Sequence, residues 1–449
     1  MPYTPHTDSE RARMLARIGV GSVDELFSDI PATLRKTSPP AIPEGLSEQE
    51  TLVHLQTLAA SNHSDYLCFL GAGAYDHLIP TAIHYLVSRQ EFLTAYTPYQ
   101  PEVSQGTLTA IFTYQTAMSR LYGLDCANAS LYDGASAAAE AVELALRHNE
   151  RTRVLISAGL HPDYHATIRT YQLGRDHIIL DTVPLDESGK TDIAALKRML
   201  SDDVSAVLLA NPNFFGVIEA DARQACAAAH ESGALAIISS HPLSLGILEP
   251  PGALGADIGI GEGQPLGIPL GYGGPYLGIM TAKQDLIRRM PGRIIGKTKD
   301  LDGKTGYVMV LQTREQHIRR EKATSNICSN EGLLATTAAI YCSLVGKAGI
   351  TEIAEQNLAK AHYAADLASQ VPGYSLAYNG AFWNEFVLKT PLPAQQILKV
   401  CVEKNIYCGV PLSWYYPQRT HELLVAVTEK RTKAEIDLWV KALREVTQQ

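Results

Sequence analysis

The chain has 449 residues, of which 46% are hydrophobic and 19% charged, a composition typical of a globular protein long enough for two or three domains. Its formal net charge of −9 argues against a broad electrostatic surface for nucleic acid or an anionic membrane. We see no apolar run that approaches the length of a bilayer span and no apolar signal core at the N-terminus, so we expect neither nucleic acid nor a membrane as a partner.

The cysteines are dispersed along the chain. There are seven, an odd number, and no two form a C-x-x-C pair. This pattern predicts reduced thiols and a cytoplasmic protein.

Residues 1–60 are predicted to form an N-terminal helical arm. Glu10–Ile18 and Val23–Phe27 are amphipathic at helical spacing, and a proline-rich joint follows at Ser38–Pro43.

Residues 61–325 are predicted to form a large α/β domain. Its strands are expected at six apolar runs: Val154–Ile156, His177–Leu180, Ala206–Leu209, Leu235–Ile238, Ile258–Ile260 and Tyr276–Met280. Helical patterns lie between the earlier runs: Asp163–Leu173, Asp192–Leu200 and Glu219–His230. Such alternation predicts a mainly parallel sheet, and the continuously apolar strands indicate that helices cover both of its faces.

Residues 326–449 are predicted to form a smaller α+β domain. A long helix is expected at Asn330–Leu344, strands at Glu385–Leu388 and Leu423–Val427, and a final helix at Lys433–Val446.

A helix is predicted to begin after Asp133-Gly134-Ala135-Ser136 and to run from Ala137 to Arg147, with Ser136 as its N-cap. A helix N-terminus with a hydroxyl and free N–H groups also suits a phosphate, so this segment is either a capped helix or an anion site.

The segment from Gly259 to Gly278 contains eight glycines in twenty residues. Such a density indicates unusual backbone angles or a close approach to another surface, or a structural loop between two strands. It does not match the G-x-G-x-x-G pattern of nicotinamide sites.

Thr94–Glu102 is predicted to be a stiff aromatic loop, because Pro98 and Pro101 flank Tyr99. Ser104 is the expected N-cap of the following helix, which ends near Gly123. Rigid aromatic loops suit interfaces and pocket mouths, and core packing is the alternative.

Two other clusters have mainly structural interpretations. His161 and His165 have helical metal spacing but no third ligand nearby, so capping or surface roles are favoured and no metal site is expected. Arg319, Arg320 and Lys322 indicate a solvated or ion-paired face, with an anion site as the alternative.

Five long segments together resemble the P-protein family of the glycine cleavage system, and specifically the alpha subunit where that protein is split in two. They are Phe69–Pro80, Thr94–Gly106, Ala127–Ala141, the glycine-rich segment and Gln312–Asn330.

The resemblance implies the fold-type I architecture of pyridoxal-phosphate-dependent transferases: a large domain with a mainly parallel sheet and a smaller C-terminal α+β domain. It implies a glycine decarboxylase that passes the aminomethyl group to the lipoyl arm of H-protein, with pyridoxal phosphate as cofactor. The expected partners are a beta subunit, in a heterodimer or heterotetramer, glycine, and H-protein transiently.

The chain departs from the catalytic pattern of that family. No lysine occurs from Arg198 to Ala282, and Gln264 stands where the Schiff-base lysine is expected. Ser239-Ser240-His241 stands where an acid would pair with the pyridine nitrogen.

We therefore expect no catalytic residue and no covalent cofactor on this chain, with the cofactor held by the partner subunit. The degenerate pocket is assigned to Ser136, Ser240, His241 and Gln264. Tyr96, Tyr99 and Gln100 are expected to line the interface or the partner's substrate pocket. The alternative is a structural or regulatory paralogue without a role in catalysis.

Overall fold

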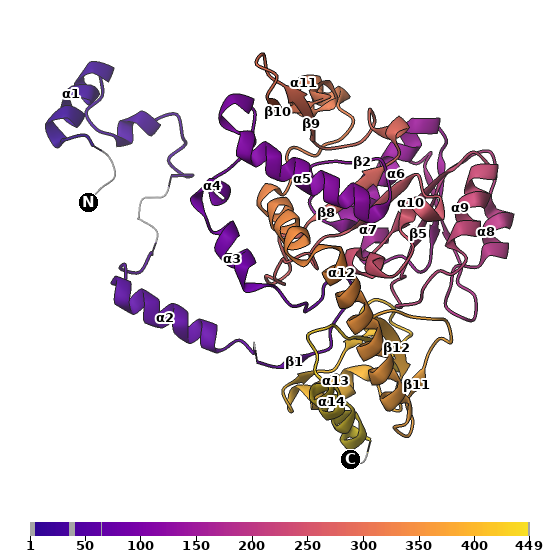
Figure 1. Ribbon diagram of the computed structural model, residues 1–449. Helices are drawn as coiled ribbons and strands as arrows, with labels where there is room; N and C mark the ends of the chain where they lie inside the picture. Colours follow the sequence, from indigo (N-terminus) through magenta and orange to yellow (C-terminus); the bar gives the residue numbers. More distant parts are fainter. Residues whose placement is uncertain (1–4, 36–40, 64, 448–449) are drawn as a thin grey trace. The chain divides into compact units, whose positions relative to one another are not determined.

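A computed structural model describes residues 5–35, 41–63 and 65–447 (Figure 1). Contacts divide the chain into two compact units, residues 1–64 and 65–449. Half of the predicted joint at Ser38–Pro43, residues 38–40, lies outside the described residues. The predicted division into an arm, a large domain and a small domain stays a prediction.

The first unit contains α1 (Asp8–Ile18), η1 (Asp24–Phe27) and α2 (Glu48–Ala60). The two predicted helical segments are confirmed, and α2 is additional. A capping box opens each α-helix: Thr7 with Glu10, and Ser47 with Glu50.

The second unit is built on a seven-stranded sheet in the order β2-β8-β7-β6-β5-β3-β4. Its strands are β2 (Cys126–Ala127), β3 (Arg153–Ser157), β4 (Ile179–Val183), β5 (Val204–Ala210), β6 (Leu235–Ser239), β7 (Ile258–Glu262) and β8 (Gly278–Ala282). Only β8 runs antiparallel to its neighbours, β2 and β7. The mainly parallel sheet is confirmed, and each of the six predicted runs overlaps a strand.

Helices cover both faces of this sheet, as the apolar strands predict (Figure 1). Val154 and Ile156 pack in the core that contains α6 (Gly134–Asn149), whereas Leu155 packs in the core that contains α9 (Ala222–Glu231). Successive strand residues point to opposite faces, so a doubly covered strand needs an apolar residue at every position. The first face also carries α7 (Pro162–Tyr171), and the second carries α8 (Ile193–Met199) and α10 (Pro251–Leu254).

The helix predicted at Asn330–Leu344 is longer than expected: α12 spans Gly332–Ser369 and contains a non-helical residue at Gly346, φ 59°. By length and composition α12 could cross a bilayer, so the expectation that no apolar run reaches that length is wrong. Ala335, Ala338 and Tyr341 are buried in a core shared with α5 (Gln105–Tyr122). Packing inside the protein therefore accounts for part of its apolar surface.

The C-terminal part forms a four-stranded antiparallel sheet in the order β11-β12-β15-β14. Its elements are β11 (Ser375–Leu376), β12 (Glu385–Lys389), α13 (Ala394–Val402), β14 (Val410–Pro411), β15 (Glu422–Ala426) and α14 (Lys433–Val446). The two predicted strands and the final helix are confirmed. With the parallel sheet, these elements confirm the fold-type I α/β architecture.

The remaining elements are short: β1 (Leu67–Cys68), α3 (Thr81–Val87), α4 (Gln90–Leu93), η2 (Pro101–Val103), η3 (Pro242–Gly246), η4 (Gln284–Leu286), β9 (Ile294–Lys299), β10 (Thr305–Val310), η5 (Gln312–Arg314), α11 (Gln316–Arg319), η6 (Arg320–Lys322), β13 (Ile406–Tyr407) and η7 (Leu412–Trp414).

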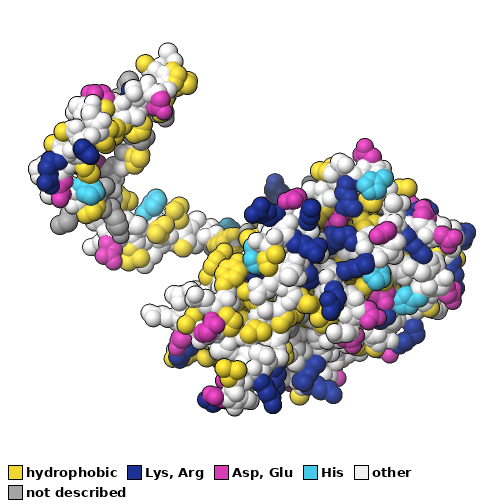
Figure 2. All heavy atoms as spheres, turned by 90° about the horizontal axis from the view of Figure 1, so that it is seen from above, with side chains coloured by type: hydrophobic (Ala, Val, Ile, Leu, Met, Phe, Trp, Pro, Cys, Tyr) yellow, Lys and Arg dark blue, Asp and Glu magenta, His cyan; other side chains and the backbone are white. Residues whose placement is uncertain are grey.

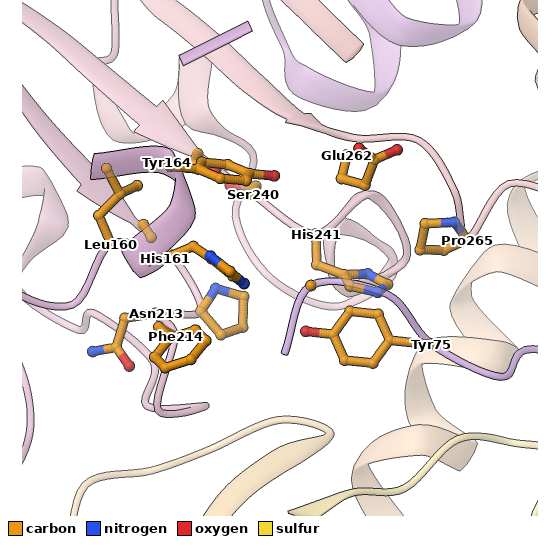
Figure 3. A pocket seen from close by; sticks show the side chains of 14 residues that line it. Tyr75, Leu160, His161, Tyr164, Asn213, Phe214, Ser240, His241, Glu262 and Pro265 are labelled. Atoms are coloured by element: carbon orange, nitrogen blue, oxygen red, sulfur yellow. The ribbon is translucent and has the colours of Figure 1, made fainter. Parts of the chain in front are cut away.

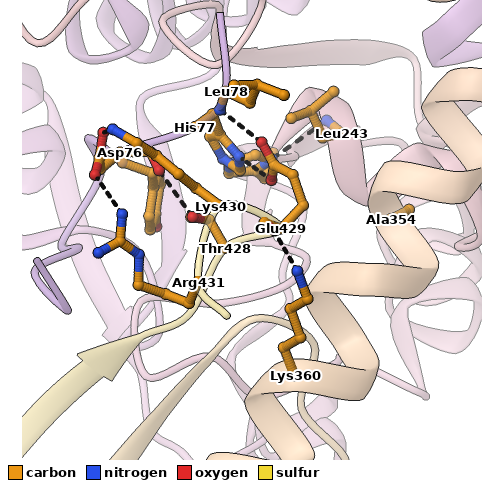
Figure 4. Close-up of polar contacts among 12 residues, drawn as sticks. Asp76, His77, Leu78, Leu243, Ala354, Lys360, Thr428, Glu429, Lys430 and Arg431 are labelled. Atoms are coloured by element: carbon orange, nitrogen blue, oxygen red, sulfur yellow. Dashed lines mark hydrogen bonds and ion pairs between the residues drawn. The ribbon is translucent and has the colours of Figure 1, made fainter. Parts of the chain in front are cut away.

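The loop before α3 is tied to the segment that follows β15 (Figure 4). Asp76 pairs with Lys430 at 2.7 Å and with Arg431 at 3.1 Å. Glu429 accepts from His77 Nδ1 at 2.8 Å and from the Leu78 N–H at 2.7 Å. These bonds hold residues 76–78 in place, and the neighbouring Tyr75 lines the pocket described next.

Candidate functional site

A cavity of about 80 Å³ lies at the carboxyl ends of the central strands (Figure 3). Its walls come from the ends of β5, β6 and β7, from the start of α7, and from Gly73 and Tyr75. Ligands of parallel α/β sheets bind at this edge. The volume is well below the roughly 300 Å³ typical of small-molecule sites.

His161 forms one wall and is held in a fixed orientation. Its Nδ1 accepts from the Asp163 N–H at 3.0 Å and caps α7, and its Nε2 donates to the Ala72 carbonyl at 2.8 Å. Its ring packs edge-on against Phe214, with centroids 4.7 Å apart. Burial lowers the pKa of His161, so the ring is neutral, and the predicted capping role is confirmed.

Ser240 and His241, two of the four residues assigned to the degenerate pocket, follow β6 and line this cavity. His241 Nδ1 accepts from the Leu243 N–H at 3.2 Å, while His241 Nε2 and Ser240 Oγ are buried without a partner among the described residues. Burial lowers the pKa of His241 well below its usual value, and the nearby His77 has a smaller effect in the same direction. Neither residue carries a negative charge toward the cavity.

Gln264, also assigned to the degenerate pocket, does not line this cavity and is 2% exposed. Its Oε1 accepts from the Tyr75 N–H at 2.9 Å, and its Nε2 donates to the carbonyls of Tyr75 at 3.1 Å and Ile268 at 2.8 Å. The side chain thus acts as a clamp, in the sense that its hydrogen bonds join the loop that contains Tyr75 to the loop that contains Ile268. No reactive amine is present at this position.

Tyr75 and Glu385 form a buried pair that sequence reasoning missed. The Tyr75 hydroxyl donates to Glu385 Oε2 at 2.7 Å, and the Ala72 N–H donates to Glu385 Oε1 at 2.7 Å. Burial raises the pKa of Glu385 to about 7. Tyr75 lies in Phe69–Pro80, one of the segments that resemble the P-protein family, and that resemblance was the only sequence signal for the pair.

Glu262 is the second residue that sequence reasoning missed. It ends β7, and its carboxylate accepts from the Gly134 N–H at 2.9 Å, from the Gln264 N–H at 2.9 Å and from the Leu277 N–H at 3.0 Å. Burial raises the pKa of Glu262 to about 7 against the effect of these donors. A glutamate inside a glycine-rich segment gave no periodic signal.

The prediction that Ser136 is the N-cap is wrong. Helix α6 begins at Gly134, its N-cap is Asp133, and Asp133 Oδ1 accepts from the Ser136 N–H at 2.7 Å. Ser136 Oγ accepts from the Asp133 N–H at 3.0 Å, so Ser136 occupies the N3 position of a capping box. Ser136 does not line the cavity. Aspartate competes well for the cap because its carboxylate accepts strongly from the free N–H groups.

The glycine-rich segment links β7 to β8, and both alternatives for its glycines apply. Gly267, Gly271, Gly273 and Gly274 have positive φ values. Gly261 has no positive φ, but an added Cβ there would overlap the Tyr122 hydroxyl. A glycine is needed at this position because another side chain approaches the backbone closely.

The loop Thr94–Glu102 does not line this cavity. Tyr96 is 83% exposed and borders a separate hollow with Phe92 and Ser329. Tyr99 is 51% exposed, and its hydroxyl accepts from Arg293 Nη2 at 3.1 Å. Gln100 is exposed, and Ser104 precedes α5, which ends before Gly123 as predicted.

The basic cluster of Arg319, Arg320 and Lys322 is exposed, which favours the solvated interpretation. In Figure 2, Lys and Arg side chains are dispersed over the visible face of the second unit, with acidic side chains between them. The described residues hold no group of three or more His, Cys, Asp or Glu side chains placed to bind a metal ion.

The family model described as glycine cleavage system P-protein matches residues 1–443. The chain belongs to the glycine cleavage system P-protein family. It is 49% identical to a probable glycine dehydrogenase (decarboxylating) subunit 1 of Chlorobium luteolum, over 99% of this chain and 100% of that one. The relative of the same name in Desulfitobacterium hafniense is also 49% identical, over the same shares.

A solved structure of a P-protein supports the same assignment. The crystal structure of glycine decarboxylase (P-protein) of the glycine cleavage system, in inhibitor-bound form, is 42% identical, with a TM-score of 0.90 over 99% of this chain and 100% of that chain. A sphingosine-1-phosphate lyase of Burkholderia pseudomallei is 13% identical, with a TM-score of 0.67 over 93% of this chain and 94% of that chain. That likeness shows the fold alone.

The cavity of this family member does not fit pyridoxal phosphate. Its volume is too small, no lysine is among its lining residues, and no carboxylate follows β6 at Ser240 and His241. The neighbouring hollow that includes Gln264 contains Lys430, but that amine pairs with Asp76 at 2.7 Å.

Proposed function

We propose that this chain is the non-catalytic but required subunit of a glycine decarboxylase, and that it completes the active site of a beta subunit which holds pyridoxal phosphate. One observation carries the proposal: Gln264, 2% exposed, is clamped by three hydrogen bonds where a Schiff-base lysine is expected. The names of the relatives supply the reaction, and the small cavity without a lysine supports the division of labour.

In the proposed complex, glycine is decarboxylated on the partner's cofactor and the aminomethyl group passes to the lipoyl arm of H-protein. The partners are a beta subunit, in a heterodimer or heterotetramer, and H-protein in a transient encounter. A cytoplasmic location is part of the proposal, and the seven free cysteines support it.

Tyr96, Tyr99 and Gln100 are proposed to face the partner subunit. Their exposure in the isolated chain supports this, because exposed aromatic residues are typical of interface cores. Arg293, which is buried, holds the loop through Tyr99 Oη and also donates to Ser329 Oγ at 2.6 Å. The loop is thus pre-organised for contact.

The test is reconstitution with a purified beta subunit. Glycine-dependent release of carbon dioxide is measured for each subunit alone and for the mixture, with co-purification as the control for assembly. We expect activity only in the mixture. Full activity of the beta subunit alone would favour the structural or regulatory paralogue, and activity of this chain alone would refute the proposal.

A second measurement checks the cofactor directly. The purified chain is mixed with pyridoxal phosphate, reduced with borohydride and digested for peptide mapping. We expect only scattered labelling of surface lysines, in proportion to their exposure. A stoichiometric adduct on one buried lysine would contradict the assignment.

A further inference from the structure

The N-terminus of helix α6 contacts Glu262, which lines the cavity, and a helix N-terminus is a natural site for an anion. The helix has 16 residues, and its first N–H groups have no partner within the helix. In an open α/β pocket such a terminus holds phosphate through backbone N–H groups. Here two of these groups, the N–H groups of Gly134 and Ser136, are already bound to carboxylates of the chain.

Two carboxylates accept hydrogen bonds from this terminus. Glu262 Oε2 accepts from the Gly134 N–H at 2.9 Å, and Asp133 Oδ1 accepts from the Ser136 N–H at 2.7 Å. Glu262 Oε1 also takes the N–H groups of Gln264 at 2.9 Å and Leu277 at 3.0 Å. Three backbone donors, one from the start of α6 and two from the glycine-rich segment, therefore converge on one side chain, the arrangement expected around an anionic ligand.

We infer that Glu262 is a built-in substitute for a bound phosphate, and that its carboxylate closes this end of the pocket to external anions. The fold retains the anion cradle, and the chain fills it from within. This inference concerns the chain's own pocket and does not depend on the proposed role in a complex.

Sterics and charge both support the closure. An added Cβ at Gly134 would overlap the Tyr164 hydroxyl and would lie 3.1 Å from Glu262 Cβ, so little space remains beside the helix terminus. A phosphate entering here would also meet Asp133 and Glu262, and repulsion between like charges is strong where water is scarce.

The closure has a structural benefit that explains its retention. Without an acceptor, the N–H groups of Gly134, Gln264 and Leu277 would be left unpaired in a partly buried site, which is unfavourable. A carboxylate fixed at the end of β7 satisfies all three without a ligand. Burial raises the pKa of Glu262 to about 7, but a protonated carboxyl group still accepts these bonds, so the closure does not require ionisation.

The experiment compares phosphate binding by full-length variants, with inorganic phosphate as the probe in calorimetric titrations and thermal-shift measurements. Glu262→Ala and Glu262→Ser remove the carboxylate, and Glu262→Gln keeps an oxygen acceptor in place. Glu140→Ala is the matched control. It removes a carboxylate of α6 whose pKa burial also raises to about 7 and which accepts from Ser325 Oγ at 2.7 Å.

We expect Glu262→Ala or Glu262→Ser to bind phosphate at least about tenfold more tightly than the wild-type chain, with a phosphate-dependent rise in Tm. Glu262→Gln and Glu140→Ala should bind no better than wild type. Equal binding by the wild-type chain, or no gain in both short variants, would overturn the inference. The inference would also be overturned if both short variants failed to fold and phosphate did not restore folding. Glu262 would then be a structural cap that no anion replaces.

Discussion

Substitution of Gln264 by lysine tests whether the missing amine is the only obstacle to cofactor chemistry. In the Gln264→Lys variant, the ammonium group can still donate to the carbonyls of Tyr75 and Ile268, but it cannot accept from the Tyr75 N–H. An orphaned buried N–H costs about 1–3 kcal/mol. A buried ammonium costs several kcal/mol more unless it deprotonates or finds a partner.

We therefore expect Gln264→Lys to lower the free energy of unfolding by about 3–5 kcal/mol, without creating a decarboxylase. The cavity of about 80 Å³ remains too small, and Ser240 and His241 still supply no carboxylate. Urea denaturation measures the stability, and borohydride reduction with peptide mapping measures covalent cofactor. Gln264→Met is the matched control, because it removes all three hydrogen bonds and adds no charge.

The reasoning is refuted if the variant, without any beta subunit, gives a stoichiometric adduct at position 264 together with glycine-dependent release of carbon dioxide. An unchanged unfolding free energy in both Gln264→Lys and Gln264→Met would show that the clamp contributes nothing.

The remaining predictions concern pH and the exposed loop. Burial raises the pKa of Glu385 from 4.5 to about 7, so its contribution to stability is fully present below about 4.5 and is lost as the pH rises through about 7. At about 1.36 kcal/mol per pKa unit, this contribution is on the order of 3 kcal/mol. Glu385→Gln should therefore reduce the fall in unfolding free energy between acidic and alkaline pH by about 3 kcal/mol. An unchanged pH dependence would count against the buried pair. Tyr96→Phe should leave the isolated chain within about 0.5 kcal/mol of wild type, because the side chain is 83% exposed. If its hydroxyl contacts bound glycine or orients a group that does, the same change should slow the assembled complex on the order of 10²-fold. Unlike Tyr96→Phe, Tyr99→Phe should destabilise the isolated chain by about 1 kcal/mol, because the hydrogen bond from Arg293 is lost. Gln100→Ala should leave the stability of the isolated chain unchanged. Wild-type kinetics for all three, in complexes that still co-purify, would place the loop away from the partner's pocket.

Periodicity predicted the large sheet well because its strands are buried on both faces. Val154, Leu155 and Ile156 are all apolar for that reason, and α14 has the bounds read from its amphipathic pattern. The start of α6 was misplaced because Asp133 and Ser136 are both good caps, and the choice depends on which N–H groups each side chain reaches in three dimensions.

The sequence by itself determined the fold class, the family and the absence of lysine from Arg198 to Ala282, because these depend on residue types along the chain. Only the tertiary structure decided how the pocket is closed. Glu262 lies 128 residues from Gly134 in the chain, and Glu385 lies 310 residues from Tyr75. No local pattern encodes such pairs, because they form only when β7 and β12 are packed beside the segments they contact. The chemistry of a buried carboxylate is set by that packing, which removes water and supplies the hydrogen-bond donors.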